Sequence, residues 1–102
     1  MTYRNPLSIS AHELKDLKEN IVSIRYNNFE LEGYIEYIIL SAQDPTKFET
    51  FEFILTPNCK AKLKKDINLI PKYFTISDIQ GIAKLSQKRT NMFLLKQMLL
   101  NF

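Results

Sequence analysis

The stretch Pro71–Phe102, PKYFTISDIQGIAKLSQKRTNMFLLKQMLLNF, decides the fold of this chain. Its pattern predicts two short helices separated by a tight break. Thr75 and Asp78 have the spacing of a capping box at the start of the first helix, which ends near Leu85. Ile79, Ile82 and Ala83 would form its apolar face. Ser86 would cap the second helix, which is expected to continue to Phe102.

The second of these helices carries two kinds of surface. Its first turns are polar and basic and contain no acidic residue, which suits a helix that enters a DNA groove. These residues are Ser86, Gln87, Lys88, Arg89, Thr90 and Asn91. The rest is apolar on most sides and needs a central position or a second chain to cover it. The predicted dimerisation stripe is Met92, Leu95, Leu99 and Phe102.

Upstream of this stretch the sequence predicts one helix and three strands. Ser10 and Glu13 form a capping box for a helix over residues 11–19. Strand-like runs cover residues 21–26, 29–40 and 48–56, and Asn27-Asn28 suits a two-residue hairpin turn. Within residues 29–40 strict alternation predicts one apolar face, which consists of Phe29, Leu31, Gly33, Ile35, Tyr37 and Ile39.

A third helix is predicted after the break at Pro57. Asn58 would cap it, Cys59, Leu63, Ile67 and Ile70 recur at helical spacing, and Pro71 would end it. The expected fold class is therefore α+β. It has an N-terminal helix, a three-stranded antiparallel sheet and a C-terminal unit of three helices, all within a single domain of residues 1–102.

Charge is distributed unevenly along the 102 residues. Residues 1–57 carry five basic and nine acidic groups, a net −4, whereas residues 58–102 carry nine basic and two acidic groups, a net +7. Such an asymmetry attracts a polyanion to one end of a molecule. The competing interpretation is a lysine-rich surface that only keeps the protein in solution.

Composition also narrows the class of protein. No apolar run is long enough for a membrane span, and the N-terminus lacks the pattern of a signal peptide. The single Cys59 cannot form an internal disulfide, which fits a reducing compartment. We therefore expect a cytoplasmic protein that does not contact a membrane.

No catalytic or metal-binding constellation is evident, so we expect no enzymatic activity and no cofactor. His12 and Cys59 are the only histidine and cysteine, too few for a structural zinc site, and their pairing would lack a third orienting group. Gly33 and Gly81 are the only glycines, so there is no glycine-rich phosphate loop.

The C-terminal pattern resembles the helix-turn-helix family, in particular its winged-helix subgroup. The matching positions are Pro71, Phe74, Thr75, Asp78, Ile79, Leu85, Ser86 and Leu94. Three positions depart from the family pattern: Gln80 replaces a small alanine, Lys84 a frequent turn glycine, and Arg89 a threonine or alanine. No hairpin follows the expected recognition helix, so a wing would come from residues 21–56 or from a partner chain.

Size, composition and element order together resemble the TcpK-type accessory proteins of clostridial conjugative plasmids. That resemblance implies sequence-specific binding of double-stranded DNA at an origin of transfer, a homodimer, and cooperation with a relaxase.

On this hypothesis the polar residues divide into three groups. Base edges would be contacted by Gln87, Lys88, Arg89 and Asn91. Phosphates would be contacted by Ser86, Thr90, Lys60, Lys64, Lys65, Lys72 and Lys84. If the hairpin makes the main DNA contacts instead of the helix, the residues that would enter the minor groove are Arg25, Asn27 and Asn28.

Two other interpretations remain open from the sequence. The helix followed by bent strands also resembles an Sm-like or SH3-like small barrel, which would bind RNA or a protein. Gly33 would then be a strand bend, Phe74–Ile79 a further strand, and Ser77–Ile82 its end. The segment Thr75–Leu85 discriminates, because it is helix in one interpretation and strand in the other. The third interpretation is a phage- or plasmid-encoded inhibitor of a host protein, whose acidic sheet mimics DNA.

Overall fold

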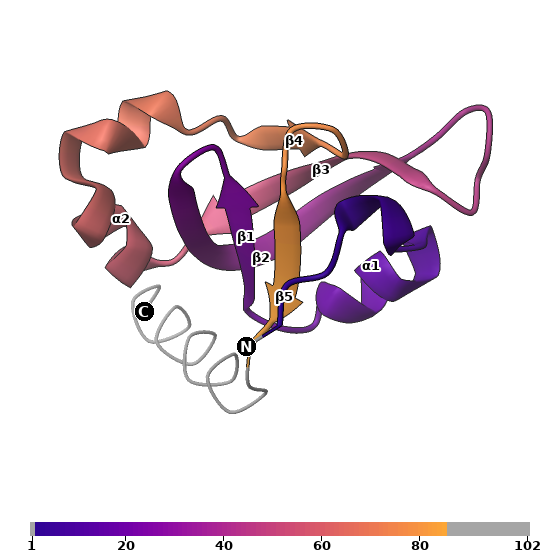
Figure 1. Cartoon of the computed structure of the whole chain (residues 1–102), viewed down its shortest axis with the longest axis horizontal. Helices are drawn as coiled ribbons and strands as arrows, with labels where there is room; N and C mark the ends of the chain where they lie inside the picture. The colour runs from indigo at the N-terminus through magenta and orange to yellow at the C-terminus, as the bar shows by residue number, and fades with distance from the viewer. Residues whose placement is uncertain (1, 86–102) are drawn as a thin grey trace, which may run out of the picture.

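A computed structural model shows a five-stranded antiparallel sheet with short helices at its margins (Figure 1). It describes residues 2–85, while Met1 and residues 86–102 lie outside the described residues. The elements are η1 (Pro6–Ser8), α1 (Ala11–Leu17), β1 (Val22–Tyr26), β2 (Phe29–Leu40), β3 (Phe48–Leu55), α2 (Pro57–Leu63), η2 (Lys64–Leu69), β4 (Tyr73–Thr75) and β5 (Gly81–Lys84). The strand order is β4-β3-β2-β1-β5.

The N-terminal half confirms its local predictions. The Ser10 side chain caps α1 by accepting a hydrogen bond of 3.1 Å from the Glu13 amide. β1 and β2 pair from Tyr26 opposite Phe29, so Asn27 and Asn28 alone form the hairpin turn. Asn27 has a φ of 52°, which asparagine tolerates better than most residues. The three strands predicted between residues 21 and 56 are all present.

The predicted helix over residues 75–85 is wrong, and with it the three-helix C-terminal unit and the α+β arrangement built on it. The Thr75 amide donates to Asp78 Oδ2 at 3.0 Å, and the Asp78 amide donates to the Thr75 carbonyl at 3.0 Å. These bonds close a turn between β4 and β5. The same Thr-x-x-Asp spacing serves a turn as well as a helix start, because both need a side-chain acceptor three residues from an amide.

The third predicted helix is present only in its first half. Thr56 Oγ1, rather than Asn58, caps α2 by accepting a hydrogen bond of 3.2 Å from the Cys59 amide, and Pro57 occupies the first helical turn. The α-helix ends at Leu63, the following residue Lys64 has a φ of 53°, and the chain continues as the 3-10 helix η2. The apolar residues predicted for one helix are therefore divided, with Cys59 and Leu63 in α2, Ile67 in η2 and Ile70 directly after it.

A β-bulge in β2 reverses the predicted faces of its second half. Ile35 pairs with Phe53 and Tyr37 pairs with Glu52, so Glu36 is an extra residue without an opposite partner. Because side chains alternate with a period of two, one extra residue exchanges the faces beyond it. Ile38 consequently packs against the core, whereas Tyr37 and Ile39 point outward, contrary to the alternation expected from the sequence.

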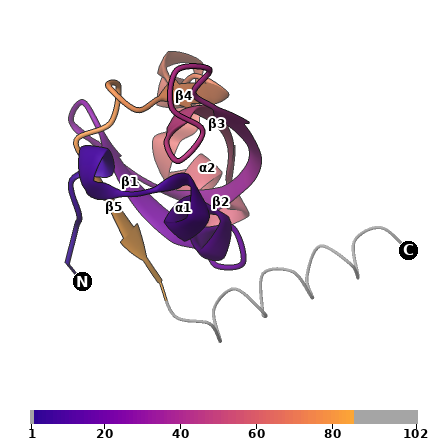
Figure 2. The ribbon, with the colours of Figure 1, turned by 90° about the vertical axis from the view of Figure 1, so that its right-hand side faces the viewer.

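The core lies on the concave side of the curled sheet, where β2 bends around it (Figure 2). Phe74 is fully buried and its ring lies 6.0 Å from that of Phe51 and 5.1 Å from that of Tyr26. Gly33 allows β2 and β3 to approach at the bend, because a Cβ there would lie 2.1 Å from the Ile54 carbonyl oxygen. A bend at Gly33 and strand structure at Phe74 are what the small-barrel interpretation expects.

An N-terminal arm, residues 2–5, covers the outer edge of β5 (Figure 2). Arg4 exchanges two backbone hydrogen bonds with Ile82, of 2.8 and 3.0 Å. The Tyr3 ring lies against Gly81, and its hydroxyl is 2.6 Å from Ser23 Oγ. The edge at β5 is therefore paired, while β4 forms the other edge of the sheet.

Candidate functional site

An apolar surface lies on the convex side of strands β2, β3 and β4. The strand register places Tyr37, Glu52 and Tyr73 in one row across the three strands. The neighbouring row contains Ile39, Thr50 and Thr75. We call the three large side chains Tyr37, Ile39 and Tyr73 the outer patch.

The side chains of the outer patch are unusually open to solvent for their size. Tyr37 is 61% exposed, Tyr73 48% and Ile39 43%. Adjacent strands lie about 4.8 Å apart, so the two tyrosines, separated by one strand, stand roughly 10 Å apart. The patch therefore offers two aromatic side chains on a rigid sheet, with the strand β3 between them.

A carboxylate occupies the position between the two tyrosines. The Glu52 side chain is only 12% exposed, and its Oε2 is 3.0 Å from the Lys72 ammonium group. The hydrogen bond from Lys72 to Glu52, followed by the charge of Glu52, raises the pKa of Lys72. Lys72 Nζ also lies 5.8 Å from the centre of the Tyr73 ring. Lys72, a predicted phosphate contact, is thus already paired with a carboxylate.

The charge around the outer patch is acidic. Glu36 is exposed and precedes Tyr37 on β2, and Glu52 lies between the two tyrosines. Over residues 2–85 as a whole, the eleven basic and eleven acidic side chains cancel. The positive surplus of the chain therefore comes from residues 86–102, which contain Lys88, Arg89 and Lys96.

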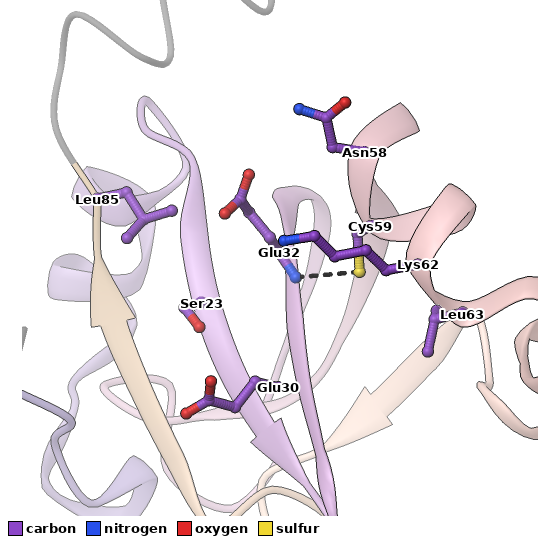
Figure 3. Close-up of a pocket in the computed structure, with 8 residues that line it drawn as sticks. All are labelled: Ser23, Glu30, Glu32, Asn58, Cys59, Lys62, Leu63 and Leu85. Carbon is purple, nitrogen blue, oxygen red and sulfur yellow. Dashed lines mark hydrogen bonds between the residues drawn. The ribbon is translucent and has the colours of Figure 1, made fainter.

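A second feature is a pocket of about 220 Å³ between α2 and strands β1 and β2 (Figure 3). We call it the acidic pocket, and its lining residues are Ser23, Glu30, Glu32, Asn58, Cys59, Lys62, Leu63 and Leu85. Glu30 also lies 3.6 Å from Arg25 and 3.4 Å from the Tyr3 hydroxyl. Leu85 is the last described residue, so the chain leaves the described structure at the rim of this pocket.

Cys59 contributes its sulfur atom to this pocket without being a free nucleophile. The side chain is buried, and Sγ accepts a hydrogen bond of 3.4 Å from the Glu32 amide. His12 is exposed on α1. Within residues 2–85 no three His, Cys, Asp or Glu side chains are grouped to hold a metal ion.

The predicted DNA contacts of residues 2–85 lie on several elements. Lys60, Lys64 and Lys65 are exposed along α2 and η2, and Lys84 is exposed at the end of β5. Arg25 is engaged by the protein itself, since its guanidinium carbon lies 4.0 Å from the centre of the Tyr3 ring and it pairs with Glu30. Asn27 and Asn28 form the hairpin tip beside it.

The other predicted contacts lie outside the described residues. They are the DNA contacts Ser86, Gln87, Lys88, Arg89, Thr90 and Asn91, and the dimerisation stripe Met92, Leu95, Leu99 and Phe102. In a helix-turn-helix another helix would precede these residues, but the structure has a turn and strand β5 at that position. The outer patch, by contrast, was not predicted as a site, because strict alternation placed Tyr37 and Ile39 inside.

Among residues 2–85, no helix has the length and apolar character required to cross a membrane. Comparison with known proteins yields no matching family model, no matching curated protein and no matching solved structure.

Proposed function

We propose that this chain is a non-enzymatic binding module of the small-barrel kind, which docks a partner protein through the outer patch. The observation that carries the proposal is the exposure of Tyr37 and Tyr73 on one face of the sheet, in one row with Glu52 between them. Tyrosine is enriched at protein interfaces and dominates their binding energy, because it buries a large area at low entropic cost.

Charge favours a protein over a nucleic acid at this face. Aromatic side chains on a sheet also stack on bases, but such platforms lie within basic grooves that neutralise phosphates. Here Glu52 lies within the patch, paired with Lys72, and the exposed Glu36 precedes Tyr37 on β2. A phosphate backbone would be repelled, whereas a protein segment with apolar and basic side chains would be complementary.

The test begins with affinity capture on the immobilised full chain, using lysate treated with nuclease. Proteins retained by the wild type and lost with Tyr37→Ala/Tyr73→Ala are purified and titrated by calorimetry. Tyr73→Ala alone should weaken binding at least 10-fold, as expected for a residue at the centre of an interface. Leu69→Ala is the matched control, because Leu69 is 63% exposed on η2 and lies outside the patch.

Two results would contradict the proposal. One is a captured set that is the same for the wild type and the double tyrosine variant. The other is a nucleic acid, single-stranded RNA or duplex DNA, that binds the wild type in fluorescence anisotropy and no longer binds the double tyrosine variant, while every captured protein still binds that variant. Retention of that nucleic-acid binding in the variant would instead assign it to another surface, such as the lysines of α2 and η2.

A further inference from the structure

The helices α2 and η2 form a lysine-rich surface at one end of the molecule (Figure 1). Residues 57–65 contain four lysines and no acidic residue, and Asp66 is the single carboxylate of η2. We call three of these lysines the lysine cluster, namely Lys60, Lys64 and Lys65. All three are exposed, and within residues 2–85 none of them forms an ion pair. Their charges are therefore available to a ligand.

The backbone holds the lysine cluster within a single turn. The Lys64 amide donates a hydrogen bond to the Lys60 carbonyl at the end of α2, and Lys65 follows directly. The three Cα atoms therefore lie within roughly 10 Å of one another. A nucleic-acid duplex carries one negative charge per roughly 1.7 Å of its axis, so three ammonium groups this close can contact phosphates of the same duplex together.

Lys64 has a backbone conformation that residues with a side chain rarely adopt. Its φ is 53° and its ψ is −127°, a combination that suits glycine. The other positive φ of a residue besides glycine within residues 2–85 belongs to Asn27, at a turn that asparagine tolerates. Glycine at position 64 would relieve the strain, so the lysine there does not serve the stability of the fold. Such strain is common where a side chain serves binding.

The composition of α2 and η2 favours the phosphate backbone of a duplex as the ligand. Residues 57–70 contain no aromatic side chain on which an unpaired base could stack. Leu69 is the only exposed large apolar side chain of α2 and η2, both of which the structure describes in full. One leucine is too little apolar surface for a helix that lies in a lipid interface. Lysine meets phosphate as a point charge, which carries no sequence information.

We propose that the lysine cluster binds the phosphate backbone of a nucleic-acid duplex without reading its sequence. Two observations support this: three exposed ammonium groups on one turn, and a lysine at the strained position 64. The activity is separate from docking at the outer patch, because the cluster lies on α2 and η2 and the patch lies on strands. Tyr37→Ala/Tyr73→Ala should therefore bind a duplex as the wild type does.

The test measures binding of the full chain to a fluorescently labelled duplex of about 20 bp by anisotropy, between about 50 and 200 mM NaCl. Replacement of the whole lysine cluster by glutamine should weaken binding at least about 10-fold at the lowest salt. It should also reduce the slope of log K against log[NaCl] by about 2–3, because each phosphate contact contributes about 0.9. A duplex of unrelated sequence should bind within about 3-fold of the first.

The matched control removes the same number of positive charges from other exposed positions. It should weaken binding less than about 3-fold, because charges beyond about 10 Å are largely screened by salt. Its three substitutions are Lys15→Gln, Lys18→Gln and Lys47→Gln.

Lys64→Gly separates binding from folding. It removes one ammonium group and relieves the positive φ, so it should weaken binding about 3- to 10-fold and raise the urea concentration at the unfolding midpoint. A variant that is more stable and binds more weakly has lost a contact to the ligand, since a damaged fold would lower the midpoint.

Four results would overturn the proposal. The first is a wild type that binds neither duplex at low salt. The second is unchanged binding in the cluster variant, which would assign the duplex to another part of the chain. The third is an equal loss in the cluster variant and its control, which would show that net charge alone governs binding. The fourth is binding to phosphatidylserine vesicles, but to no duplex, that is lost with the cluster variant, which would identify a membrane as the ligand.

Discussion

The two glycines of this chain illustrate how one hydrogen atom in place of a side chain shapes the fold. At Gly33 the β3 backbone approaches so closely that a Cβ would lie 2.1 Å from the Ile54 carbonyl oxygen. At Gly81 the nearest group is instead the Tyr3 side chain, which a Cβ would meet at 3.1 Å. A backbone carbonyl inside a strand pair cannot move without breaking the ladder, whereas the N-terminal arm that carries Tyr3 needs to move by only a few tenths of an ångström.

Gly33→Ala should therefore destabilise the protein more than Gly81→Ala. We expect a loss of about 1–3 kcal/mol in the free energy of unfolding for Gly33→Ala, as for other overpacked sites. For Gly81→Ala we expect less than about 1 kcal/mol, because the arm at Tyr3 can shift by the small distance required. Urea denaturation followed by far-UV circular dichroism measures both values. Equal losses would contradict the close approach at Gly33.

At the level of elements, the N-terminal half could be predicted from sequence because its signals are local. A capping box, an asparagine turn and alternating strands each act within a few residues. The signals of Thr75–Leu85 are equally local but ambiguous, since Thr75 and Asp78 bond in the same way in a turn and at a helix start. Pairing of β5 with β1, a contact between residues about 60 positions apart, decides the outcome.

The bulge in β2 could not be predicted from the sequence pattern either. Glu36 opposes no residue of β3, and nothing in its identity marks it as the extra residue. One available signal was the pair Ile38-Ile39, because two adjacent isoleucines cannot both face the core of a regular strand. The outer patch depends on this bulge, which explains why the candidate site was missed while the strand itself was predicted.

The bulge predicts opposite outcomes for two adjacent isoleucines. Ile38→Glu should cost about 2 kcal/mol or more, because the carboxylate would be forced against the core. Ile39→Glu should change stability by no more than about 0.5 kcal/mol, since Ile39 is 43% exposed. Thermal or urea unfolding of the two variants gives the comparison. The reverse order would support regular alternation through Glu36 and would remove the outer patch.

For the whole molecule, the arm at residues 2–5 joins the beginning of the chain to its last described strand. Arg4 pairs with Ile82 through its backbone and with Glu13 of α1 through its guanidinium group. The arm covers one sheet edge, which otherwise would be open to pairing with another chain. At the other edge, β4 is only three residues long, and both Thr75 backbone groups are bonded to Asp78.

This connection makes stability depend on pH in the acid range. The hydrogen bond from Arg4, more than any other contact, lowers the pKa of Glu13 from its ordinary value of 4.5. A carboxyl with a lowered pKa in the folded state stabilises the fold above pH 4.5, and this contribution is lost as the pH falls through the folded-state pKa. The urea concentration at the unfolding midpoint of the wild type should therefore decrease when the pH is lowered below 4.5.

Glu13→Gln should lower the midpoint at pH 7 and flatten its decline in acid, and Arg4→Gln should have the same effect. Measurement of urea midpoints between pH 2.5 and 7 for the three proteins provides the test. Profiles that run parallel to that of the wild type would show that the ion pair between Arg4 and Glu13 does not contribute to stability. Asp44, whose pKa is lowered chiefly by the Thr46 hydroxyl, accounts for part of the remaining decline.

The bulge at Glu36 also has a consequence for how this surface can be altered. Because Glu36 is the extra residue, its deletion would remove the bulge and still leave Ile35 opposite Phe53 and Tyr37 opposite Glu52, so Tyr37 would continue to face outward and Ile38 the core. A regular ladder that included Glu36 would have the opposite effect, because it would turn Tyr37 toward the core and bring Ile38 to the surface. The composition of the outer patch therefore depends on how β2 pairs with β3 as much as on its residues, and a change that abolished the bulge while keeping Glu36 would redirect the patch without a substitution in it.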